Sequence, residues 1–171
     1  MNLNNSDARS LSTIKTFTPL ILILSIIMFF TIMRRFIYGW DAIAAMNDFM
    51  GSFFIVFSLF KIYNLHGFVE AFSMYDLIAK RSTMYAYAYP FIELCLGIAY
   101  LNGLFPIATN LATLFFMIVG SIGVAYELAQ NKEIVCACLG AVFKLPMTYV
   151  TLIENISMAI MALCMLLYFY R

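Results

Sequence analysis

The feature that most constrains this chain is a series of five apolar runs, each near the length that crosses a lipid bilayer. A helix rises about 1.5 Å per residue, so about 20 apolar residues are needed to span a hydrocarbon layer of roughly 30 Å. We therefore predict an all-α fold, a polytopic membrane helical bundle. The five predicted spans cover residues 17–33, 42–61, 84–104, 107–126 and 147–170.

The composition excludes several classes of protein. Of 171 residues, 64% are hydrophobic and 11% are charged, against about 25% charged in an ordinary soluble domain. Such a chain is not expected to fold as a water-soluble globule. Its net charge of +1 provides no positive field for capturing a polyanion. We expect the lipid bilayer, and not nucleic acid, as its partner.

The first apolar run is predicted to be a retained anchor helix and not a signal peptide. It is longer than a usual signal-peptide core, and Arg34 and Arg35 separate it from the small-residue triplet 42–44 that would act as a cleavage site. We therefore divide the chain into a polar tail with an anchor helix, residues 1–41, and a four-helix membrane domain, residues 42–171.

The connections between spans two, three and four differ in kind. Residues 66–81 are too polar to cross a membrane, but they carry apolar residues at helical spacing, which predicts a short amphipathic helix lying in the interface. Asp76 and Lys80 are four residues apart, which predicts an ion pair on that helix. The Asn, Gly and Pro of residues 102–106 predict a tight turn. The apolar stripe consists of Phe68, Phe72, Tyr75 and Ala79.

Polar side chains within the spans need a physical reason, because a charge in hydrocarbon costs at least about 2.5 kcal/mol. Glu93 lies near the middle of the third span, and Glu154 and Asn155 lie in the fifth. One interpretation is that the two glutamates face each other or a wet cavity, where they carry protons, ligate a cation or orient a quinone-like headgroup. The other is that they are hydrogen-bonding contacts between helices. We expect Asp48 to be interfacial or a helix cap, and Lys61 to extend its ammonium to the headgroups.

Two cysteines, Cys136 and Cys138, lie together in the segment between spans four and five. Thiols this close allow a dithiol/disulfide couple, whose bond would be strained and easily reduced. They also allow soft sulfur ligation of a metal ion with further ligands from elsewhere. The spacing does not choose between these, nor exclude two structural cysteines. Cys95 and Cys164 lie inside spans and are expected to be small buried packing residues.

The basic residues indicate an orientation. Seven Lys and Arg residues fall on the side of the amino terminus and three, Arg34, Arg35 and Arg171, on the other. Because cytoplasmic loops are enriched in Lys and Arg, this predicts a cytoplasmic amino terminus and a cytoplasmic Cys136 segment. The sequence also lacks nucleotide-binding, zinc-protease and hydrolase motifs.

The order of these motifs resembles the methylamine utilisation protein MauE family, within the DoxX-like group of four-helix membrane proteins. The resemblance covers residues 49–166. It departs from the family at Leu59, where a glycine is usual, and at Leu139, where an aromatic residue is frequent. The matching motifs are the glycine-led span from Gly51 to Lys61, Gly67-Phe68, Pro90-x-x-Glu93-x-x-x-Gly97, Cys136-x-Cys138-x-Gly140, Pro146 and Glu154-Asn155.

The resemblance implies a four-helix, redox-associated core in the bacterial inner membrane, with one extra N-terminal transmembrane helix. It further implies thiol/disulfide exchange that supports maturation of a partner protein, of the kind represented by the small subunit of methylamine dehydrogenase. On this hypothesis Cys136, Cys138 and Glu93 are the catalytic residues, and the partner is a redox protein. The alternatives are a membrane protein that binds or transports a soft metal ion, with a metal-carrying partner, and a structural assembly partner. An outward-facing loop, which an exported partner requires, conflicts with the orientation from charge.

Overall fold

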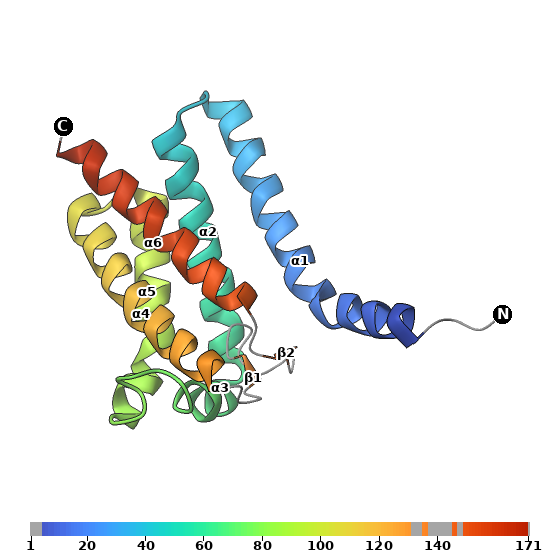
Figure 1. Ribbon diagram of the computed structural model, residues 1–171. Coiled ribbons are helices and arrows are strands. Elements are labelled where there is room, and N and C mark those ends of the chain that lie inside the picture. Colours follow the sequence, from blue (N-terminus) through green and yellow to red (C-terminus); the bar gives the residue numbers. More distant parts are fainter. Residues whose placement is uncertain (1–4, 131–134, 137–144, 147–148, 171) are drawn as a thin grey trace.

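The chain folds into helices joined by short connections. The computed structural model describes residues 5–130, 135–136, 145–146 and 149–170, with the side chains of residues 18–130 and 152–170. Two strands of two residues each pair antiparallel between the last two helices (Figure 1). In order, the described elements are α1 (Asn5–Tyr38), α2 (Ala42–Tyr63), α3 (Leu65–Phe72), α4 (Thr83–Asn102), α5 (Pro106–Ala129), β1 (Val135–Cys136), β2 (Leu145–Pro146) and α6 (Tyr149–Phe169).

Five of the described helices are long and apolar enough to cross a membrane. This confirms the predicted all-α polytopic bundle. In Figure 1, α2, α4, α5 and α6 form the core, and α1 lies against α2 at one side. The segment of α1 before Pro19 points away from the bundle, as a helix often does where proline removes a backbone hydrogen bond. The spanning segments are Thr18–Tyr38, Ala42–Tyr63, Thr83–Asn102, Pro106–Ala129 and Leu152–Phe169.

Two glycines bring α2 and α4 into close contact. A Cβ atom at Gly97 would lie 2.8 Å from the Ile55 side chain and 3.0 Å from the carbonyl oxygen of Gly51. A Cβ atom at Gly51 would lie 2.7 Å from Leu101. Small residues of this kind allow two helix backbones to approach inside a membrane, where no hydrophobic effect drives helices together. The pair fixes an antiparallel register between α2 and α4.

The junction of α1 with α2 corrects two predictions. Arg34 and Arg35 do not end the first helix, since α1 continues to Tyr38. Asp48 is not a helix cap: it is buried, and its two carboxylate oxygens each lie 2.7 Å from one of the two guanidinium groups. Asp41 caps α2 instead, accepting a hydrogen bond of 2.8 Å from the Ala44 amide. The paired aspartate allows the arginines to remain within the membrane end of α1.

The amphipathic segment is helical only in its first half. Helix α3 ends at Phe72, and turns lead from there to α4. The predicted stripe is nevertheless confirmed, because Phe68, Phe72, Tyr75 and Ala79 are all buried. Its turns are held by the carboxylate of Asp76, which accepts hydrogen bonds of 2.9 Å from the amides of Ile78 and Ala79. Burial nonetheless raises the pKa of Asp76 above its ordinary value.

The predicted ion pair between Asp76 and Lys80 is wrong. Lys80 instead lies 2.5 Å from the buried carboxylate of Glu127, near the end of α5. At Gly123, one turn earlier, a Cβ atom would lie 2.5 Å from the carbonyl oxygen of Tyr75. The turn segment thus packs directly on the backbone of α5 and is fastened there by Lys80. The tight turn at residues 102–106 is confirmed, with Gly103 at φ 64° and Pro106 opening α5.

The contact between α2 and α4 can be tested by enlarging Gly97. We expect Gly97→Leu to lower the free energy of unfolding by about 1–3 kcal/mol, because the new side chain meets backbone atoms of α2. The measurement is the thermal unfolding midpoint of purified protein in detergent. Cys95→Leu is the matched control, because Cys95 is on the same helix and exposed. Equal midpoints for the two variants would contradict the close packing.

Candidate functional site

A buried ion pair between α2 and α4 is the centre of the candidate site. The ammonium nitrogen of Lys61 lies 2.6 Å and 2.5 Å from the two carboxylate oxygens of Glu93. Both residues are buried, Lys61 at 7% and Glu93 at 4% exposure. The prediction that Lys61 extends to the headgroups is therefore wrong. A lysine in the last turn of a span can usually reach the interface, but here a carboxylate on the neighbouring helix attracts it inward.

The helix register explains why these two residues meet. The antiparallel packing that sets Ile55 against Gly97 brings a residue about two turns later in α2 beside one about a turn earlier in α4. Lys61 and Glu93 occupy those positions. The ammonium also lies 5.5 Å from the ring centre of Phe68 and 5.2 Å from that of Tyr89. The negative faces of these rings add to the attraction of the carboxylate.

The pair borders a small cavity of about 40 Å³ inside the bundle. Its walls come from α2, α3, α4, α5, α6 and the turn after α3, so the site exists only when the bundle is assembled. Half of the lining residues are aromatic. The polar lining residues are Lys61, Glu93, Glu154 and Asn155, and the others are Phe53, Phe57, Phe68, Phe72, Tyr75, Tyr89, Met117 and Gly120.

The structure therefore brings the two predicted intramembrane glutamates to one cavity. Glu154 comes from the first turns of α6, and its Oε1 atom is buried without a hydrogen-bond partner among the described residues. Asn155 approaches α5 at Gly120, where a Cβ atom would lie 3.3 Å from the amide nitrogen of the asparagine. A cavity with one balanced ion pair and one carboxyl without a described partner can hold water and move protons.

The cysteine segment is described only in part. Cys136 lies in β1, where it pairs with Leu145 of β2. Cys138 lies outside the described residues, and so does the side chain of Cys136. Strand β1 contacts α3, as Figure 1 also shows. Two side chains of α3, Phe68 and Phe72, line the cavity, so the helix that β1 contacts also forms part of the cavity wall.

Cys95 and Cys164 are exposed on the helix surfaces, so the prediction that they are buried packing residues is wrong. In the part of the chain that the structure describes, no group of three or more His, Cys, Asp and Glu side chains is placed to hold a metal ion. The hypothesis of a metal at Cys136 and Cys138 involves side chains outside that part.

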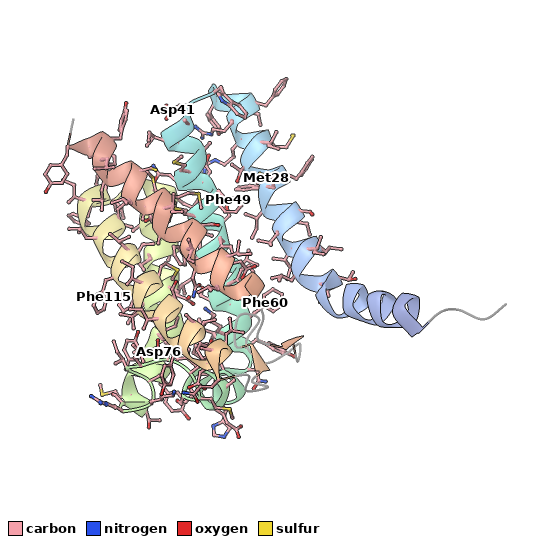
Figure 2. All side chains as sticks on the ribbon, in the orientation of Figure 1. Met28, Asp41, Phe49, Phe60, Asp76 and Phe115 are labelled. Atoms are coloured by element: carbon pink, nitrogen blue, oxygen red, sulfur yellow. The ribbon has the colours of Figure 1, made fainter. Side chains whose placement is uncertain are left out.

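The sequence analysis did not predict that Lys61 is the partner of Glu93, nor that aromatic rings surround the two residues. It singled out Glu93 and Lys61 separately but did not join them. Opposite charges on consecutive antiparallel spans are a signal that could have suggested the pair. Figure 2 shows the side chains of the bundle, with Phe60, one residue before Lys61, at the end of α2 nearest to α3.

These features define a multi-pass integral membrane protein with an acid–base pair in its core. The model of the family described as methylamine utilisation protein MauE matches residues 40–168, and the chain belongs to this family. The family's description associates its members with methylamine utilisation. No curated protein and no solved structure matches the chain.

The buried pair can be tested by a double-mutant cycle. We expect Glu93→Gln to lower the free energy of unfolding by about 3–5 kcal/mol, because it leaves the Lys61 ammonium buried without its counter-ion. Lys61→Met should also destabilise, but the double variant should be more stable than the sum of the two losses predicts. The measurement is thermal unfolding in detergent, with Glu70→Gln on the exposed side of α3 as control. Strictly additive losses would show that the two residues do not interact.

Proposed function

We propose that this chain is a membrane protein of thiol/disulfide exchange that supports the maturation of a disulfide-bonded partner protein, of the methylamine dehydrogenase small-subunit type. The observation that carries the proposal is the position of β1: the strand that contains Cys136 packs on α3, whose Phe68 and Phe72 line the cavity of Lys61 and Glu93. Membership of the MauE family supports the association with methylamine utilisation.

The proposed chemistry needs the chain, its partner protein and a third protein that reoxidises the loop. When the loop is oxidised, a thiolate of the partner attacks the Cys136–Cys138 disulfide and forms a mixed disulfide. The partner's second thiolate then displaces the loop sulfur, so that the partner gains the disulfide and the loop becomes a dithiol. Two electrons pass from partner to loop, and two protons follow them. The reverse exchange regenerates the loop disulfide with an oxidised protein of higher reduction potential.

The cavity has a role in the proton movements of this exchange. Glu154 lies in the second turn of α6, the helix that follows the cysteine segment, and its Oε1 atom has no partner among the described residues. Glu93 is bound to Lys61, which stabilises its charge. We propose that Glu93 is the residue that holds the charge balance of the cavity, and that Glu154 takes up and returns the proton. In this scheme residues 42–171 are the functional domain, residues 1–41 anchor it, and the chain resides in the bacterial inner membrane.

The exchange is tested by trapping thiols in membranes that contain the full chain. In a Cys95→Ala/Cys164→Ala background, a maleimide reagent of high mass reports only Cys136 and Cys138. We expect the two thiols to be modified together after reduction and protected together after oxidation by a graded thiol redox buffer. Cys138→Ser should leave one thiol that stays reactive throughout that buffer range. Two thiols that remain reactive under every oxidant would contradict the proposal.

The side of the membrane is tested with a membrane-impermeant maleimide on intact cells, again in the background without Cys95 and Cys164. An exported partner requires that Cys136 and Cys138 are labelled without lysis. Labelling only after lysis would confirm the orientation expected from the basic residues and would contradict maturation of an exported protein. A cysteine introduced at the exposed Trp40 position, at the opposite end of α2, should give the opposite labelling and serves as the control.

A further inference from the structure

A second concave site lies on the outside of the core, between α1, α2 and α6. It is an open groove of about 370 Å³, remote from the cavity of Lys61 and Glu93 and sharing none of its residues. Figure 2 labels Met28 of α1 and Phe49 of α2, which both line it. Its wall is apolar except at one end. The residues used below are Met28, Arg35, Trp40, Ala45, Phe49 and Met161.

The polar end of the groove carries more positive than negative charge. Arg34 and Arg35 share the single carboxylate of Asp48. The side chain of Arg35 is only 9% exposed, and its Nε atom has no hydrogen-bond partner among the described residues. The nearby Asp41 is exposed and its carboxylate is engaged in capping α2 at Ala44. One guanidinium charge at the groove is thus uncompensated by a buried acid, which is costly within a membrane.

The same end of the groove lies at the level of the lipid headgroups. Arg35 is in the last turn of α1, and the exposed rings of Tyr38 and Trp40 follow it. Aromatic side chains of this kind concentrate at the boundary between hydrocarbon and water. The apolar part of the groove, from Phe49 to Met28, therefore runs from the headgroup level toward the bilayer centre.

We propose that this groove is a binding site for an anionic phospholipid. One acyl chain lies along the apolar wall, and the phosphate accepts hydrogen bonds from the Arg34 and Arg35 guanidinium groups. A net anionic headgroup balances the excess charge that Asp48 leaves, and a zwitterionic headgroup does not. The acyl chain of the lipid thereby fills the space between α1 and the core. The lipid in this way joins the N-terminal anchor to the four-helix unit. This inference is independent of the thiol chemistry.

The single tryptophan of the chain reports on the site, because Trp40 lines the groove. The full chain is placed in nanodiscs of phosphatidylcholine with a rising fraction of brominated phosphatidylglycerol. A second series contains phosphatidylglycerol with a rising fraction of brominated phosphatidylcholine. The quenching of Trp40 fluorescence is measured in both series. Attraction of one net basic charge predicts about a fivefold preference for the anionic lipid. Arg35→Gln should reduce the ratio to near one, while Arg81→Gln, a change of the same charge at an exposed site, should leave it unchanged.

A second variant keeps the test decisive if Arg35→Gln does not fold. Ala45→Leu narrows the groove and leaves every charge in place, so it should abolish the preference as well. A preference that survives both variants, or equal quenching by the two lipids in the unmodified chain, would overturn the proposal. Absence of quenching by either lipid would also overturn it, since protein and not lipid would then cover the groove. Loss of quenching on adding a short-chain quinone at low concentration would assign the groove to a different ligand.

Discussion

The ion pair of Lys61 and Glu93 is the interaction on which the core of this protein depends. The Glu93 charge alone, near the middle of α4, would cost about 2.5–3.5 kcal/mol in a membrane. At 2.5–2.6 Å, with aromatic rings on the ammonium, the two charges satisfy each other, and each is stable only while the other helix is in place. The glycine contact between α2 and α4 sets the register that makes this possible. Close packing and charge therefore specify the same arrangement of α2 and α4.

Ion pairs with a buried carboxylate also join neighbouring elements at two other places in the fold. Asp48 fastens α1 to α2 through Arg34 and Arg35, and Glu127 fastens the turn after α3 to α5 through Lys80. In lipid, apolar side chains gain little by leaving hydrocarbon for another helix, so apolar burial does not specify which helices meet. Buried pairs of opposite charge do specify it, because a wrong neighbour leaves a charge without its partner. These few charged residues thus specify the contacts of α1 with α2, of α2 with α4, and of the turn after α3 with α5.

This division explains what could be predicted from the sequence. The five spans, the turn at residues 102–106 and the apolar stripe from Phe68 to Ala79 follow from local hydropathy and turn chemistry, and the structure confirms them. The partners of Lys61, Asp48 and Lys80 were predicted wrongly, because each prediction used the nearest local rule: snorkelling, capping or an i, i+4 pair. The real partners lie 13 to 47 residues away and depend on tertiary packing. Glu93 could be recognised as costly in the membrane, but the cavity around it depends on five helices and a turn.

The size of the cavity limits what the core can do for the cysteine segment. A space of about 40 Å³ holds roughly two or three water molecules and excludes a peptide, a quinone ring or a second protein side chain. On the proposed function, the partner protein meets the chain at the end of the bundle where β1 contacts α3, and not inside the cavity. On the proposed function, what passes between that end and the buried carboxyls is a proton, carried by water between Glu154 and the ion pair. The proposed function therefore assigns the contact with a partner to the cysteine segment, and proton transfer to a carboxyl that the core keeps from bulk water.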